Sequence, residues 1–119
     1  MDIYTSTYRY NGIDRLDITV KGNDHVGRIF APTWDMVMGI KNGTMSEEEY
    51  TLRYMEIVAT AIVDYNDIFF PLLIRKRITA VCFCPAGAFC HRVLWARALV
   101  TLGHDYKGEI PWQSNVTAL

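Results

Sequence analysis

The chain has 119 residues and a formal net charge of −1, with 50% of its residues hydrophobic and 13% aromatic. This length and composition predict one domain whose apolar core needs no disulfide or metal ion to fold. The near-neutral charge excludes the strongly basic surface typical of duplex-DNA-binding proteins. The sequence shows no signal peptide and no apolar stretch of the ~20 residues that cross a membrane, so we expect a cytoplasmic location and no membrane partner.

The first half of the chain predicts two strands followed by a helix. β-branched and aromatic residues favour strands over residues 3–10 and 16–20. Thr33 is placed to cap the following helix at its N-terminus, and Gly43 is placed to end it.

A second and longer helix is predicted over residues 46–65. Ser46 and Glu49 have the spacing of a capping box, and apolar residues then recur at helical intervals. The next segment, residues 66–74, predicts a short helical connector that is interrupted at Pro71.

The last predicted elements are a strand over residues 78–84 and a helix over residues 88–102. The strand is almost continuously apolar, which is typical of a central strand buried on both faces. Strands alternating with helices predict an α/β fold, namely a compact Rossmann-like single domain over residues 1–119, with a mainly parallel sheet flanked by helices. We expect the tail, residues 110–119, to pack over an edge or onto a partner, and Trp112 favours a homo-oligomer.

The stretch CFCPAGAFCHRVLWARAL, which begins at Cys82, contains all three cysteines of the chain. It predicts a strand, a loop and the start of a helix, which is where ligands bind in open α/β sheets. Unpaired N–H groups at the helix N-terminus favour an anion, and the guanidinium of Arg92 suits phosphate or carboxylate oxygens. An internal carboxylate, such as that of Asp17 or Glu109, is the alternative partner for Arg92.

Three more specific sites compete for this stretch. A phosphatase loop is excluded, because it needs five residues between its cysteine and arginine, whereas Cys84 and Arg92 enclose seven. Zinc is disfavoured, because adjacent Cys90 and His91 would point about 100° apart on a helix and the cysteine spacing is atypical; we therefore predict no metal and no cofactor. A reactive thiol remains, with Cys90 as nucleophile and His91 as base. Its alternative, a small buried hydrophobic residue, is the more common role of a free cysteine.

The run FCPAGAFCHRVLWARAL resembles the Cys…Phe-Cys-His-Arg signature of the domain-of-unknown-function family numbered 488, small single-domain proteins of bacteria and their phages. The resemblance extends to IYTSTYRY, DITVKG, FAPTWDMVMGIKNGTMSEEEYTLRYMEIV and GHDYKGE, and so covers most of the chain. It implies a compact Rossmann-like α/β domain and no general activity.

The candidate ligand-binding residues are hydroxyls, cations and aromatic rings near strand ends and helix N-termini. They are Thr5, Ser6, Tyr8, Thr19, Lys21, Arg28, Thr33, Trp34, Phe89, Cys90, His91 and Arg92. Hydroxyls and cations would hold phosphate, and rings would stack on a base. Several have simpler roles as alternatives: Thr33 as a helix cap, Lys21 as a solvated lysine, and Trp34 as a core or interface residue.

We therefore expect the chain to bind a phosphorylated nucleotide-like small molecule at residues 89–92 without turnover, as a phage protein that sequesters a host nucleotide immune signal would do. The first alternative is an enzyme that acts on a nucleotide or modified base with Cys90 as nucleophile. The second is a protein-partner binding module that uses Trp34 and Trp112.

Overall fold

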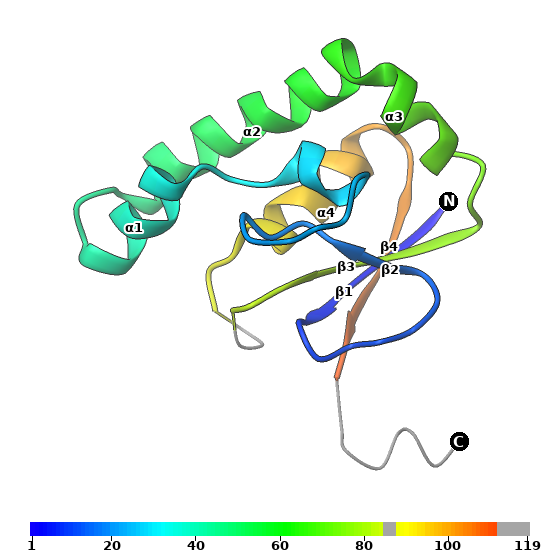
Figure 1. Cartoon of the computed structure of the whole chain (residues 1–119), viewed down its shortest axis with the longest axis horizontal. Helices are drawn as coiled ribbons and strands as arrows, with labels where there is room; N and C mark the ends of the chain where they lie inside the picture. Colours follow the sequence, from blue (N-terminus) through cyan, green and yellow to red (C-terminus); the bar gives the residue numbers. More distant parts are fainter. Residues whose placement is uncertain (85–87, 112–119) are drawn as a thin grey trace.

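The computed structural model describes residues 1–84 and 88–111 of the chain. Within these ranges, four parallel strands form one sheet in the order β2-β3-β1-β4 (Figure 1). The strands are β1 (Asp2–Thr7), β2 (Arg15–Asp17), β3 (Arg77–Cys82) and β4 (Asp105–Ile110). β3 is a central strand, and every residue in it after Arg77 is buried, as expected for a strand covered on both faces.

Helices connect the strands and cover the sheet. They are the 3₁₀ helix η1 (Gly27–Phe30) and the α-helices α1 (Trp34–Asn42), α2 (Glu47–Asp64), α3 (Asn66–Leu72) and α4 (His91–Thr101). α4 packs against β1, β3 and β4 on one side and against α2 on the other, so it lies between the sheet and α2 (Figure 1). The predicted α/β fold with a parallel sheet flanked by helices is confirmed.

The apolar core fills the space between these layers and fixes the start of α4. The ring of Trp95 packs edge-on against Phe30, with ring centroids 6.1 Å apart. The hydroxyl of Tyr54, on α2, donates to the backbone carbonyl of Phe30 at 2.8 Å. The same Tyr54 ring contacts His91, the first residue of α4, at a centroid distance of 5.5 Å. The N-terminus of α4 is therefore held against both η1 and α2.

The predicted helix caps are confirmed. The Ser46 hydroxyl accepts a hydrogen bond from the backbone N–H of Glu49 at 3.0 Å, and Thr33 accepts one from Met36. Gly43 ends α1 in the left-handed region at φ +74°, where a residue without a Cβ is favoured.

The sequence pattern does not predict β4. This strand lies at the edge of the sheet, its first three residues are exposed, and it lacks an apolar run. Gly108 adopts φ +116° in the part of the strand where the pairing of β4 with β1 shifts register. Such an irregular edge strand is formed by its pairing with β1 rather than by its own propensity. Trp112 and the rest of the tail lie outside the described residues.

Several predicted boundaries are wrong: β1 ends at Thr7 rather than at residue 10, and β3 ends at Cys82 rather than at residue 84. Three further differences have a clear physical reason. α3 continues through Pro71 to Leu72, because a proline one residue before the end of a helix removes only one backbone hydrogen bond. β2 stops at Asp17, whose carboxylate accepts hydrogen bonds from the backbone N–H and hydroxyl of Thr19 and so turns the chain. α4 begins at His91 rather than at residue 88, because Cys90 is an N-cap with extended backbone (φ −155°, ψ 150°).

Candidate functional site

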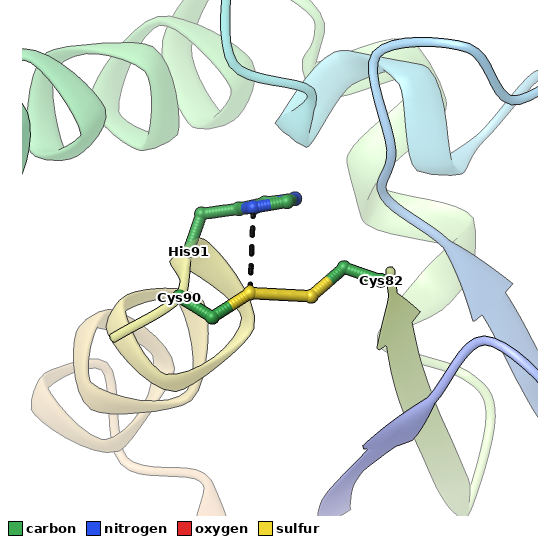
Figure 2. A group of neighbouring side chains, drawn as sticks. All are labelled: Cys82, Cys90 and His91. Atoms are coloured by element: carbon green, nitrogen blue, oxygen red, sulfur yellow. Dashed lines mark hydrogen bonds between the residues drawn. A yellow bond between two sulfur atoms is a disulfide. The ribbon is translucent and has the colours of Figure 1, made fainter. Parts of the chain in front are cut away.

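Cys82, Cys90 and His91 converge where β3 ends and α4 begins. The sulfurs of Cys82 and Cys90 are joined as a disulfide, and Nδ1 of His91 lies 3.8 Å from Sγ of Cys90 (Figure 2). All three residues are buried. The prediction that helical geometry would separate Cys90 from His91 is wrong, since the extended backbone of Cys90 directs its side chain independently of the helix.

The second ring nitrogen of His91 fixes the tautomer of the imidazole. Nε2 lies 2.7 Å from the backbone carbonyl of Ile18, and because a carbonyl can only accept, Nε2 carries the hydrogen. Nδ1 therefore presents its lone pair towards Cys90 (Figure 2). Burial lowers the pKa of His91 to about 4, with the positive charge of Arg92 acting in the same direction. The imidazole is thus neutral near pH 7 and can accept a proton or bind a metal ion.

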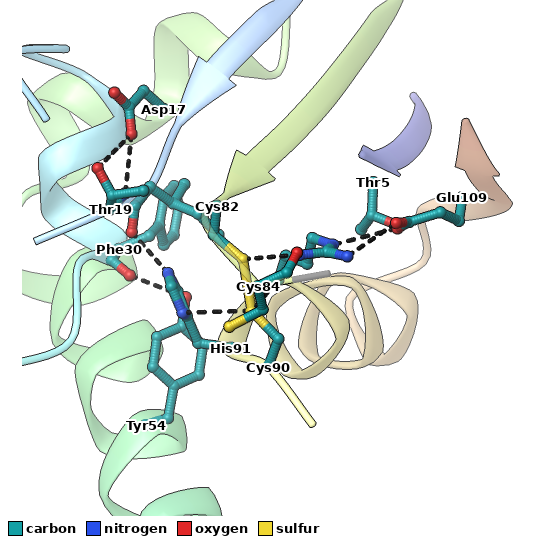
Figure 3. Close-up of a disulfide and its surroundings, with 12 residues drawn as sticks. Thr5, Asp17, Thr19, Phe30, Tyr54, Cys82, Cys84, Cys90, His91 and Glu109 are labelled. Carbon is teal, nitrogen blue, oxygen red and sulfur yellow. Dashed lines mark hydrogen bonds and ion pairs between the residues drawn. A yellow bond between two sulfur atoms is a disulfide. The ribbon is translucent and has the colours of Figure 1, made fainter. Parts of the chain in front are cut away.

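Arg92 is fully buried and bridges the sulfurs to β4. Its Nε and Nη2 donate to the two carboxylate oxygens of Glu109 at 3.1 and 2.8 Å (Figure 3). Its Nη1 donates to Sγ of Cys82 at 2.9 Å and to the carbonyl of Cys84 at 2.8 Å. Thr5 also donates to Glu109, at 2.6 Å. Of the two internal carboxylates considered as partners of Arg92, Glu109 is the one observed. The guanidinium of Arg92 also contacts the sulfur of Cys82.

An apolar cavity of about 260 Å³ lies over Cys90 and His91. Its described lining residues are Thr19, Val20, Pro32, Val37, Ile40, Lys41, Tyr50, Phe83, Cys84, Phe89, Cys90 and His91. Three aromatic rings surround the space, and the lining has one charged side chain, the exposed Lys41, within the described ranges. Pockets for drug-sized ligands usually exceed 300 Å³, so this cavity suits a single ring system.

Two titratable side chains of the cavity are protonated near neutral pH. Burial raises the pKa of Tyr50, so its hydroxyl remains a hydrogen-bond donor. Burial also raises the pKa of the Cys84 thiol, and the nearby positive charge of Arg92 only partly opposes this. At neutral pH the Cys84 side chain is therefore mainly the unreactive thiol, and it is the natural control for Cys90.

A second and more open groove also reaches Cys90. It is formed by the start of α2 and the exposed face of α4, with a volume of about 960 Å³. Its described lining contains two acidic side chains, Glu47 and Glu48, and one basic side chain, Arg97, so its net charge is negative and disfavours an anionic ligand. The apolar cavity is therefore the better candidate for a nucleotide-like molecule.

The twelve predicted binding residues fall into three groups. Thr19, Phe89, Cys90 and His91 line the cavity, whereas Thr5, Ser6, Tyr8 and Arg92 form internal contacts and Lys21, Arg28, Thr33 and Trp34 lie outside the cavity. Lys21 lies 5.4 Å from the centre of the Trp34 ring, which remains half-exposed. The simpler role of Thr33 as a cap is the one observed.

Sequence reasoning missed several residues of the site. Tyr50 has the spacing of a core residue on α2, and Phe83 was assigned to a strand that ends one residue earlier. Lys41 is at the exposed end of α1, where a lysine is expected for solubility alone. The hydrogen bond between His91 and Ile18 could not be predicted from residue types, because it uses the backbone carbonyl of Ile18, which every residue has.

Comparison with known proteins gives a family. A family model named DUF488-N3a, described as the active DUF488-N3 subclade, matches residues 1–103. No curated protein and no solved structure matches the chain. Among the helices in the described ranges, none is long and apolar enough to cross a membrane. With 103 of its 119 residues matched, the Cys-His-Arg site included, the chain belongs to the DUF488-N3a family.

Proposed function

We propose that the chain binds a phosphorylated nucleotide-like small molecule through its planar ring, in the cavity over Cys90 and His91. The observation that carries this proposal is the lining of the cavity. Tyr50, Phe83 and Phe89 offer aromatic faces and edges to a ring, and Thr19 adds a hydroxyl. The volume of about 260 Å³ admits the ring alone, so the phosphate would remain outside, where Lys41 offers a positive charge.

The first test identifies the ligand. Reduced protein is incubated with nucleotides, cyclic dinucleotides and ADP-ribose derivatives, recovered and denatured, and the released molecules are analysed by mass spectrometry. We expect one phosphorylated compound to be retained. A compound returned unchanged would support capture without turnover, the behaviour of a phage protein that sequesters a host signal. Retention of none of these compounds would contradict the proposal and favour a protein partner.

Lys41→Ala is expected to weaken binding of the retained compound about tenfold, because it removes one charge-assisted contact to phosphate. The matched control is Lys107→Ala, which removes an exposed lysine on β4 that does not line the cavity. Isothermal titration calorimetry with both variants measures the difference. Equal affinities for the Lys41 variant and the wild type would show that the phosphate does not lie at this rim.

Enzymatic turnover is a second candidate function, and the tautomer of His91 favours it. In the reduced protein, the thiol proton of Cys90 can pass to Nδ1 while Nε2–H stays on the carbonyl of Ile18. The guanidinium of Arg92, whose Nη1 lies 3.7 Å from Sγ of Cys90, would stabilise the thiolate. The thiolate would then add to the carbon of a C=N bond of the bound ring: the S–C bond forms, the π electrons of C=N move to the ring nitrogen, and that nitrogen takes up the proton held by His91.

If this second candidate is correct, Cys90→Ser abolishes turnover but leaves the ligand bound, because the hydroxyl keeps the size of the side chain but is a far weaker nucleophile. Cys84→Ser, in the same cavity, should keep wild-type turnover. Product formation is followed by mass spectrometry. Full turnover by the Cys90 variant would rule out the thiol mechanism.

A further inference from the structure

We propose that Cys82, Cys90 and His91 of the reduced protein form a binding site for Zn²⁺. One ligand atom from each residue, the two sulfurs and a ring nitrogen of His91, lies within 4.8 Å of the others, and all three residues are buried. Two thiolates and one imidazole are among the donor sets that zinc prefers. Since these residues come from the end of β3 and the start of α4, folding alone brings them together (Figure 2).

The orientation of His91 is an independent observation in favour of the site. Metal-ligating histidines almost always donate their second ring N–H to a carboxylate, a backbone carbonyl or water. His91 does so: Nε2–H donates to the carbonyl of Ile18 at 2.7 Å, which leaves the lone pair of Nδ1 directed at the sulfurs. The imidazole is therefore held in the tautomer and direction that coordination requires before any metal binds.

The backbone spacing of the two cysteines also suits a shared ion. Their Cα atoms are 7.9 Å apart, whereas disulfides are usually found at about 4.4–6.8 Å. Two Zn–S bonds of about 2.3 Å at a tetrahedral angle place the sulfurs about 3.8 Å apart. Once the S–S bond is reduced, two sulfurs that share an ion can lie farther apart than two bonded sulfurs. This larger distance between the sulfurs fits the 7.9 Å separation of the Cα atoms better than a disulfide does.

Charge balance favours the ion as well. Two buried thiolates repel each other, and the two positive charges of Zn²⁺ would neutralise them. Arg92 does not upset this balance, because the carboxylate of Glu109 pairs with its guanidinium through two hydrogen bonds. Its Nη1 instead donates to Sγ of Cys82 at 2.9 Å, the kind of second contact that stabilises a thiolate ligand (Figure 3).

The fourth coordination position would face the apolar cavity. Cys90 and His91 both line that cavity. Three protein ligands with one open position distinguish catalytic zinc sites from structural ones, which are closed by a fourth protein ligand. A water molecule, or a nitrogen or oxygen atom of a ligand in the cavity, would occupy this position. The site itself does not depend on which molecule enters the cavity.

The test uses the full chain with the metal alone. Protein is reduced with a phosphine, freed of metal and titrated with Co²⁺ under anaerobic conditions, and the cobalt is then displaced by Zn²⁺. We expect one equivalent of Co²⁺ to give a thiolate charge-transfer band in the near ultraviolet and intense visible bands typical of tetrahedral coordination. Cys82→Ala should lose the charge-transfer band and Zn²⁺ binding, whereas Cys84→Ala should retain both.

Cys82→Ala also separates this proposal from the thiol mechanism, since it removes a metal ligand but leaves the nucleophile in place. Alkylation of Cys90 by iodoacetamide, monitored by mass spectrometry, should slow at least tenfold when Zn²⁺ is added to the wild type and should not change in the Cys82 variant. Circular dichroism verifies that the variants are folded. Absence of the cobalt bands in folded, reduced wild type would overturn the proposal, as would bands that depend on Cys84 instead of Cys82.

Discussion

Arg92→Ala is expected to lower the free energy of unfolding by about 3 kcal/mol, the lower end of the range for breaking a buried ion pair. The side chain of Arg92 is only 1% exposed and that of Glu109 is 27% exposed, so the carboxylate left behind gains partial hydration. The variant also leaves the carbonyl of Cys84 without a donor that it receives in the wild type. The loss of stability is therefore expected whether or not Arg92 also affects ligand binding.

Urea denaturation of the wild type and two variants measures this loss. Arg97→Ala is the matched control, because it removes an exposed arginine from the same helix and should change stability by less than about 0.5 kcal/mol. Arg92→Lys should fall between the two, since an ammonium group keeps the charge but cannot form the paired hydrogen bonds to Glu109. A loss below about 1 kcal/mol for Arg92→Ala would contradict the buried ion pair as a major stabilising contact.

The fold was largely predictable because its main signals are local. The N-cap of α2 needs only Ser46 and the backbone N–H of Glu49, three residues later, and the apolar run of β3 indicates a buried strand. β4 was not predictable in this way, because its polar sequence becomes a strand only through pairing with β1, about one hundred residues earlier in the chain.

The place of the site in the fold was predictable, but the contacts between its side chains were not. The Cys90–His91–Arg92 motif marks the right place, where a central parallel strand leads into a helix. One backbone conformation decides the rest: in a regular helix Cys90 would point away from His91, whereas its extended N-cap conformation brings their side chains together. The pairing of Arg92 with Glu109 likewise depends on the placement of β4. Such contacts are set by tertiary packing, which residue spacing does not encode.

Acidification is expected to destabilise the protein through His91. Burial lowers the pKa of this residue from 6.5 to about 4, so between these values the unfolded chain binds a proton that the folded chain excludes. Because the unfolded state binds more protons, stability rises with pH across this window. The full contribution is present above pH 6.5, and about 3 kcal/mol is lost as the pH falls to about 4. The groups that act on His91 are the carbonyl of Ile18 and the charges of Arg92 and Asp17.

Denaturant unfolding of reduced, metal-free protein at a series of pH values between 7 and 4 measures this loss. His91→Gln removes the titrating group and keeps an N–H donor for the carbonyl of Ile18, so its stability should vary much less over the same interval. His104→Gln is the comparison variant: burial also lowers the pKa of His104, but this side chain is partly exposed whereas His91 is buried, and its removal should leave most of the pH dependence intact. If the His91 variant retained the wild-type pH profile, the pKa of the imidazole would be the same in the folded and unfolded protein, and His91 would not be the source of the acid sensitivity.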